Sequence, residues 1–156
     1  MKAIRFDHYG EPAKVLTVQE CPLPEPRKGE VRVRILATPV NPSDLLFVRG
    51  LEDTGVQPHF PSPVGFEGVG IVDALGPQVD GPVPGQRVVV INWNGGNWAE
   101  YAVVPVRDAL PVPDDLPDEK VASFFINPAT AILMLRHVLA IPQGYSNQQP
   151  APNWDA

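Results

Sequence analysis

The sequence predicts a mainly β fold with short helices, in which residues 1–113 form a small antiparallel barrel or sandwich. Residues 30–40 alternate apolar and polar side chains with a period of two, which is typical of a strand with one buried face. Residues 69–75 form an apolar run interrupted only by Gly70 and Asp73, as expected of a buried strand. Twenty prolines are spread through the 156 residues without a repeat, so short strands and rigid turns should dominate.

Periodicity and turn residues place the individual elements. We expect strands over residues 2–6, 14–20, 30–40, 69–75, 86–91 and 98–104. After the third of these strands, Asn41 is a favoured N-cap, Pro42 suits the first helical position, and Asp44 complements the positive end of a helix. A short helix should therefore run to Val48 and end at Gly50.

The last third of the chain changes character. Residues 117–125 begin with an acidic helical turn, and Asn127 followed by Pro128 predicts a further helix that runs to about Ala140. This helix is apolar on nearly all sides, so it should be buried on more than one face. Residues 145–156 are polar, contain prolines and show no periodicity, and we expect them to form a disordered tail.

Composition narrows the classes of function. The net charge of -6 speaks against nucleic acid or an anionic membrane surface as a partner. Cys21 is the one cysteine, which excludes an internal disulfide and a multi-cysteine zinc cluster. Met1 leads directly into the first expected strand, with no signal peptide and no run of membrane-spanning length, so we expect a cytoplasmic protein.

Four short motifs follow one another with regular order and spacing. They are Asn41–Asp44 (NPSD), Gly65–Gly70 (GFEGVG), Pro84–Val88 (PGQRV) and Asn127–Ala131 (NPATA). On these motifs the chain resembles the medium-chain dehydrogenase/reductase superfamily, in its zinc-independent branch of quinone oxidoreductases and enoyl reductases. The resemblance covers residues 1 to about 144. It implies the N-terminal catalytic domain of these enzymes, a partly open β-barrel akin to GroES.

Two departures refine this resemblance. Zinc-bearing members carry a cysteine where Asn41 stands and a histidine where Phe66 stands, so the resemblance implies a site without metal. Enoyl-thioester reductases are expected to place a tyrosine proton donor shortly after Gly50, but residues 51–53 read Leu-Glu-Asp. The proton donor of the implied reaction is therefore not identified by the sequence.

The resemblance also implies a cofactor domain that this sequence does not contain. In these enzymes the final helix leads into a Rossmann domain, whose glycine-rich turn holds the dinucleotide pyrophosphate. Gly68 and Gly70 lie inside an expected strand and open no helix, so we interpret them as packing residues. We therefore divide the chain into a GroES-like domain over residues 1–126, a crossing helix over residues 127–144 and the tail over residues 145–156.

Asn41 and Thr130 are the candidate catalytic and cofactor-binding residues. By the resemblance, the Asn41 amide would bond to the nicotinamide end of the cofactor or to a substrate carbonyl. The alternative is an N-cap that stabilises its helix by about 1 kcal/mol. Thr130 would contact the nicotinamide amide, or would instead bond back to its own helix. Trp93 and Glu52 are the candidate substrate-pocket residues, and Glu67 is interpreted as a structural residue that holds the glycine-rich turn.

Three functions compete. In the first, the chain is the substrate domain of a zinc-free, NADPH-dependent oxidoreductase that reduces a quinone or an enone by hydride transfer. It would be inactive alone, because it lacks an anchor for the cofactor. In the second, it is a non-catalytic GroES-like binding or oligomerisation module. The third, a chaperonin cofactor, rests on fold analogy alone and is rejected because the NPSD motif and the crossing helix serve no such role. The apolar helix over residues 128–140 separates the first two functions. The first predicts that this helix drives homodimer formation or self-association, whereas a clean monomer would favour the independent module.

Overall fold

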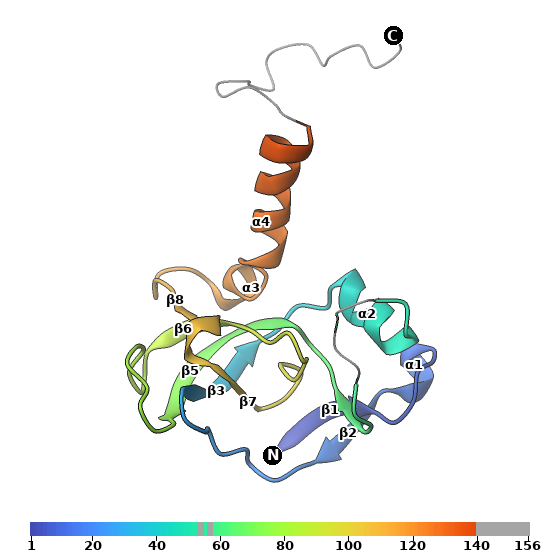
Figure 1. Cartoon of the computed structure of the whole chain (residues 1–156), viewed down its shortest axis with the longest axis horizontal. Helices are drawn as coiled ribbons and strands as arrows, with labels where there is room; N and C mark the ends of the chain where they lie inside the picture. Colours follow the sequence, from blue (N-terminus) through green and yellow to red (C-terminus); the bar gives the residue numbers. More distant parts are fainter. Residues whose placement is uncertain (53–54, 56–57, 140–156) are drawn as a thin grey trace. The chain divides into compact units, whose positions relative to one another are not determined.

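Figure 1 shows the computed structural model, which describes residues 1–52, 55 and 58–139. The chain divides into two compact units, Met1–Phe125 and Ile126–Ala156. The expected helix end at Ala140 and the expected tail over residues 145–156 lie outside the described residues. No helix in the described part of the chain is long and apolar enough to cross a membrane.

The first unit contains the strands and four short helical segments. The strands are β1 (Lys2–Phe6), β2 (Thr17–Glu20), β3 (Glu30–Ala37), β4 (Ser62–Pro63), β5 (Glu67–Leu75), β6 (Arg87–Ile91), β7 (Tyr101–Pro105) and β8 (Ala109–Pro111). The helical segments are α1 (Pro12–Val15), α2 (Pro42–Arg49), the 3-10 turn η1 (Val106–Asp108) and α3 (Asp118–Val121). The second unit contains α4 (Ile126–Leu133) and the π-helical turn η2 (Met134–Val138).

The strands form two antiparallel sheets, so the predicted mainly β fold is confirmed (Figure 1). One sheet has the order β2-β1-β4, and the other has the order β7-β3-β5-β6-β8. A bridge between Ala3 and Ala99 and a backbone hydrogen bond of 2.8 Å from Ile4 to Trp98 connect β1 with the segment before β7. The two sheets do not close into a continuous barrel, as expected of a partly open GroES-like fold. Within the described residues there is no Rossmann domain.

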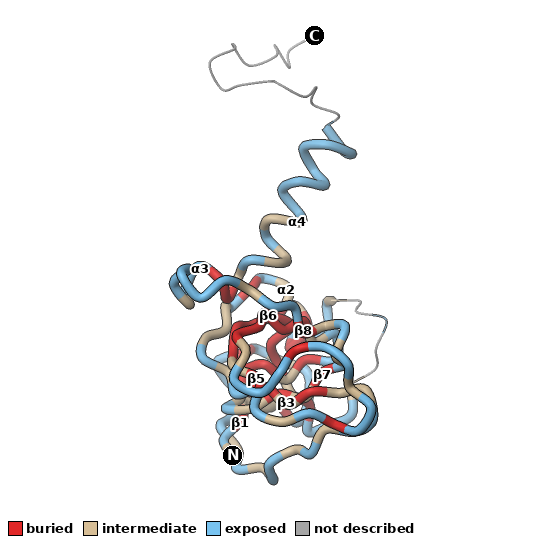
Figure 2. Tube along the Cα trace, turned by 90° about the vertical axis from the view of Figure 1, so that its left-hand side faces the viewer, coloured by how far each residue is buried: buried red, intermediate tan, exposed pale blue. Residues whose placement is uncertain are grey.

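The core lies on the two faces of the larger sheet. Figure 2 shows buried residues concentrated in β3, β5 and β6. Strand β6 is buried along its whole length because it contributes to two apolar clusters. One cluster contains Val31, Val33, Val72, Val88, Val90, Val104 and Ala109. The other contains Val69, Val89, Val121 and Ala122, and it packs α3 against the sheet.

Two glycines permit the close packing around β5. Gly65 has a φ of +95°, and a Cβ there would lie 2.3 Å from Cδ1 of Trp98. A Cβ at Gly70 would lie 2.3 Å from the carbonyl oxygen of Arg34 on the neighbouring strand. No side chain fits at these distances, so both positions serve packing, in agreement with the interpretation of Gly70 from the sequence.

Several expected elements begin at different residues in the structure, including β5, which begins at Glu67 rather than residue 69, and β6, which begins at Arg87 rather than residue 86. Strand β2 begins at Thr17 rather than residue 14, because Pro12–Val15 forms a helical turn first. Strand β7 begins at Tyr101 rather than residue 98, because the backbone N–H of Trp98 donates to Val64 instead of entering the sheet. Helix α4 begins at Ile126, so Pro128 lies in its first turn, where a missing N–H costs no helical hydrogen bond.

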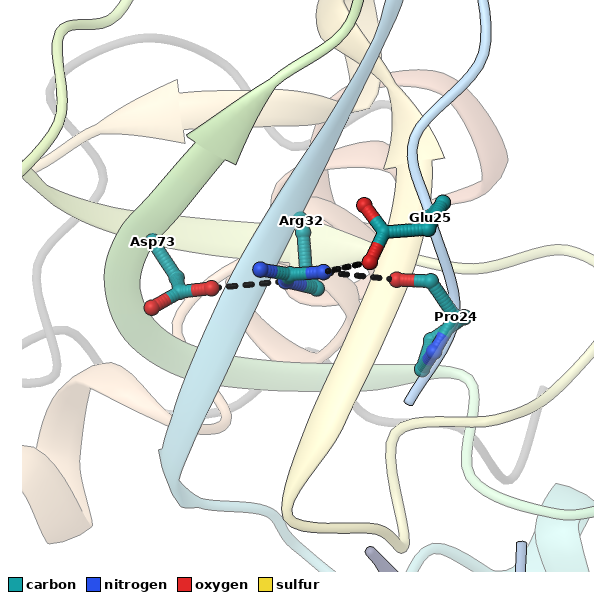
Figure 3. Close-up of polar contacts among 4 residues, drawn as sticks. All are labelled: Pro24, Glu25, Arg32 and Asp73. Carbon is teal, nitrogen blue, oxygen red and sulfur yellow. Dashed lines mark hydrogen bonds and ion pairs between the residues drawn. The ribbon is translucent and has the colours of Figure 1, made fainter. Parts of the chain in front are cut away.

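An ion-pair network ties the proline-rich connector to the larger sheet (Figure 3). The Nε atom of Arg32, on β3, donates to Oδ2 of Asp73 on β5 at 2.6 Å. Its Nη1 atom donates to the carbonyl oxygen of Pro24 at 3.0 Å and lies 3.1 Å from Oε1 of Glu25. The guanidinium carbon also lies 6.0 Å from the centre of the Tyr101 ring. One largely buried side chain therefore joins β3, β5 and the connector.

Candidate functional site

The candidate site lies where the loop between β3 and α2 meets the glycine-rich turn before β5. The hydroxyl of Thr38 donates to the carbonyl oxygen of Glu67 at 2.7 Å. The indole N–H of Trp98 donates to the carbonyl oxygen of Pro39 at 3.0 Å. The side-chain Nδ2 of Asn41 donates to Oε1 of Glu67 at 2.9 Å. Three side-chain hydrogen bonds therefore hold residues 38–41 in place before α2 begins.

Asn41 enters the site because of how α2 begins. Its backbone is extended, with φ -90° and ψ 154°, and Pro42 follows as the first helical residue. The backbone N–H of Asn41 donates to Oδ2 of Asp44 at 2.7 Å, which is one half of a capping box. Helix α2 ends at Gly50, which adopts a left-handed conformation, as the sequence predicts.

The second oxygen of Asp44 reaches the glycine-rich turn. Oδ1 accepts the backbone N–H of Phe66 at 3.1 Å, and the Asp44 side chain is buried. Burial raises the pKa of the Asp44 carboxyl above its ordinary value, and the nearby charge of Glu67 adds to this effect. The two N–H bonds, from Asn41 and Phe66, act in the opposite direction because they favour the charged form.

Glu67 and Asn41 form the polar centre of the site. Glu67 is the first residue of β5 and only 1% exposed, and Asn41 is 7% exposed. A buried amide that donates to a carboxylate has a fixed orientation and little freedom to rotate. The arrangement can therefore present a rigid polar group to a ligand that reaches this loop, and it also secures the start of α2.

The residue next to Glu67 belongs to an aromatic cluster. The ring centre of Phe66 lies 5.3 Å from that of Phe47 on α2, and Phe47 lies 5.6 Å from Phe6 on β1. Phe60 lies 5.4 Å from Phe6, and the Tyr9 ring contacts both. These contacts form an aromatic cluster that extends from β1 through α2 to the residue before Glu67.

The residues of the polar centre do not fit a zinc ion. An amide at Asn41 and a phenyl ring at Phe66 supply neither thiolate nor imidazole. Among the residues that the structure describes, no three His, Cys, Asp or Glu side chains gather as a metal site.

The other predicted site residues lie elsewhere. Trp93 is 60% exposed in the loop after β6, and Glu52 is partly buried beyond the end of α2. Two cavities, of about 470 and 260 Å³, lie on the first unit, and neither is lined by Trp93 or Glu52. Thr130 is exposed on α4, in the second unit. The structure thus brings Asn41 together with Glu67 but does not join either to Trp93 or Glu52.

Sequence reasoning missed three contributors to the site. Thr38 carries no motif, and its bond to Glu67 follows only from the pairing of β3 with β5. The sequence favours a core-packing role for Trp98, which is buried, but does not indicate that its indole N–H holds the loop. Asp44 was assigned to the helix end alone, and its spacing of three residues from Asn41 was the available signal of a capping box.

Comparison with known proteins identifies the fold. Residues 27–114 match the family described as "Alcohol dehydrogenase GroES-like domain". The chain belongs to this family. This match confirms the resemblance of the four motifs to the medium-chain dehydrogenase/reductase superfamily.

This GroES-like domain has longer relatives, several of which are named reductases or oxidoreductases. The human mitochondrial enoyl-[acyl-carrier-protein] reductase is 37% identical over 153 residues, which is 98% of this chain and 40% of the relative. The structure of Escherichia coli quinone oxidoreductase complexed with NADPH matches with a TM-score of 0.80 and 28% identity, over 88% of this chain and 41% of that one. The structure of the Etr1p/NADP/crotonyl-CoA complex matches with a TM-score of 0.76 and 28% identity, over 87% of this chain and 43% of that one. The chain thus spans about 40% of the length of these relatives.

Proposed function

We propose that the chain is the substrate-side domain of a zinc-free, NADPH-dependent oxidoreductase that reduces a quinone or an enone or enoyl group. The observation that carries this proposal is the buried Asn41–Glu67 hydrogen bond, which fixes a polar group beneath the loop that begins α2. Support comes from relatives that are named enoyl reductase and quinone oxidoreductase, the latter in complex with NADPH.

In this function the cofactor, when bound, supplies the hydride. Asn41 orients the nicotinamide end or the substrate carbonyl, and Glu67 keeps the amide in place. The assignment of Thr130 to the nicotinamide amide rests on the resemblance alone and stays a proposal. Trp93 and Glu52 are proposed to border the bound substrate. Polar groups preorganised in this way stabilise negative charge that develops on the substrate oxygen.

The described residues fit only one end of NADPH. Asn41 suits the nicotinamide end, but no glycine-rich turn opens a helix in the described part of the chain, so the pyrophosphate lacks its usual anchor. We therefore propose that the 156-residue chain binds NADPH weakly and has no reductase activity alone.

A titration with a quinone tests the proposed site. Tetramethyl-1,4-benzoquinone is suitable, because its fully substituted ring resists addition of the Cys21 thiol. We expect the shifted backbone N–H signals of the ¹⁵N-labelled chain to gather at residues 38–44 and 65–67. Replacement of Asn41 by Leu should weaken these shifts. Shifts that are absent, or that gather on the far side of the larger sheet, would contradict the proposal.

The second unit favours an additional role in self-association. Its helical segments expose large apolar side chains, namely Ile132, Leu133, Met134, Leu135, Val138 and Leu139, with exposed fractions between 48% and 74%. Each such side chain gains roughly 1.5–3 kcal/mol on full burial, so this surface favours a partner. We propose that the 156-residue chain forms a homodimer through it. A non-catalytic binding or oligomerisation module remains the alternative function, and the cytoplasm remains our prediction for its compartment.

A further inference from the structure

We propose that Asp44 is the positioning residue of the candidate site, which sets the orientation of the Asn41 amide by fixing both segments on which the Asn41–Glu67 hydrogen bond depends. This inference rests on the proposed function of Asn41. It assigns to Asp44 a role beyond the start of α2.

The carboxylate of Asp44 bridges two segments that are far apart in the sequence. Oδ2 accepts the N–H of Asn41 at 2.7 Å, and Oδ1 accepts the N–H of Phe66 at 3.1 Å. A helix cap requires only the first of these bonds. The second reaches a residue 22 positions further along the chain, in the turn that precedes β5. One side chain thus fixes the distance between the two backbones.

The two anchored N–H groups stand directly beside the polar pair. Asn41 itself carries the donor Nδ2, and Phe66 is followed at once by Glu67, which carries the acceptor Oε1. A shift of either backbone therefore moves one partner of the 2.9 Å hydrogen bond. The Thr38 hydroxyl supports the same arrangement, since it donates to the carbonyl oxygen of Glu67.

The burial of Asp44 is unusual for a residue that only caps a helix. Asp44 is only 1% exposed, and burial raises the pKa of its carboxyl because it removes water from the charged form. An exposed carboxylate would cap α2 without that cost. The buried position is explained if both backbone N–H groups must be held at once, because each would otherwise be a buried donor without an acceptor.

Two variants separate positioning from capping. In Asp44→Asn one oxygen becomes an NH₂ group, so only one of the two backbone N–H groups keeps its acceptor. Asp44→Ser offers a single acceptor on a shorter side chain. It serves as the test variant if Asp44→Asn does not fold. Asp73→Asn is the matched control, because it makes the same chemical change at an ion pair with Arg32, outside the site.

The first readout is the side-chain NH₂ signal of Asn41 in ¹H–¹⁵N spectra, assigned through its loss in Asn41→Leu. We expect the two protons of this group to differ strongly in the parent chain, because one donates to a carboxylate. In Asp44→Asn or Asp44→Ser the signal should move toward its position in Glu67→Gln, and in Asp73→Asn it should stay in place. An unmoved signal in a folded Asp44 variant would overturn the proposal.

The second readout is the dissociation constant for tetramethyl-1,4-benzoquinone. We expect it to rise about tenfold in Asp44→Asn, which corresponds to about 1.4 kcal/mol, and to remain unchanged in Asp73→Asn. If the parent chain binds no quinone, the proposed function fails, and the Asn41 signal alone decides the role of Asp44. If the parent binds and Asp44→Asn binds equally well with a displaced Asn41 signal, Asp44 does not position the amide for this ligand.

Discussion

Asn41 and Asp44 serve both the start of helix α2 and the candidate site, through different atoms of each residue. The sequence predicted the helix start, because Asn41 is a good N-cap and Pro42 a good first residue. It could not predict that the second oxygen of Asp44 binds Phe66, since that contact depends on how β3 and β5 are paired. Tertiary contacts of this kind decide which polar residues become part of a site.

The pKa of Asp44 makes one contribution to stability depend on pH. Folding raises the pKa of the Asp44 carboxyl above its ordinary value of 3.8. The group therefore stabilises the folded chain at pH values below 3.8, and this contribution is lost as the pH rises through the pKa of the folded state. Asp44→Asn removes the titration. We expect the variant to be less stable by about 1–3 kcal/mol, because it leaves one buried N–H without an acceptor.

The difference in unfolding free energy between the parent chain and Asp44→Asn, measured at two pH values, tests the direction of this pKa shift. Urea unfolding should show a larger advantage of the parent chain over Asp44→Asn at about pH 4 than at about pH 7. The comparison cancels the contributions of carboxylates that do not interact with Asp44. An advantage that grows as the pH rises would show that folding lowers the pKa of Asp44 and favours its charged form, and a constant advantage would show that folding does not shift this pKa. Either result would contradict the prediction.

Strands and helices were predicted where a local pattern decides them. The alternation in residues 30–40 and the apolar run near residue 70 correspond to β3 and β5, the central strands of the larger sheet. The starts of β2 and β7 were wrong, because a helical turn and the long-range contacts of Trp98 override the local period there. Pairing order and register also depend on contacts that are distant in sequence.

Arg32 should contribute more to stability than an exposed ion pair of the same type. It bonds to Asp73 on β5 and to Pro24 in the connector, and its side chain is 12% exposed. We expect Arg32→Met to lower the free energy of unfolding by about 2 kcal/mol. Arg49→Met, which breaks the exposed pair with Glu11, should cost less than about 1 kcal/mol. Equal losses in urea unfolding of the two variants would contradict the structural role of the Arg32 network.

The whole 156-residue chain exposes an apolar helical surface, and that surface should determine its association state. Replacement of Leu135 and Leu139 by Glu should shift the mass measured by light scattering from dimer to monomer while the strands remain folded. Val18→Glu is the control, because Val18 is also exposed, at 69%, but lies on β2. A parent chain that is monomeric at high micromolar concentration would contradict self-association through this surface.

The proposed function assigns to this chain the substrate side of a reductase, without the main anchor of the cofactor. The chain spans about 40% of the length of its relatives, and its described residues contain the polar centre at Asn41 but no turn that binds a pyrophosphate. Substrate recognition and cofactor binding should therefore be separable in this protein.

Calorimetric titration of the purified 156-residue chain with NADPH, followed by an assay of NADPH oxidation with tetramethyl-1,4-benzoquinone, tests this claim most directly. We expect no measurable binding at micromolar cofactor and no oxidation above the rate without protein, because no glycine-rich turn among the described residues opens a helix that could hold the pyrophosphate. Binding of NADPH with a micromolar dissociation constant, or steady oxidation of NADPH by the quinone, would contradict the account.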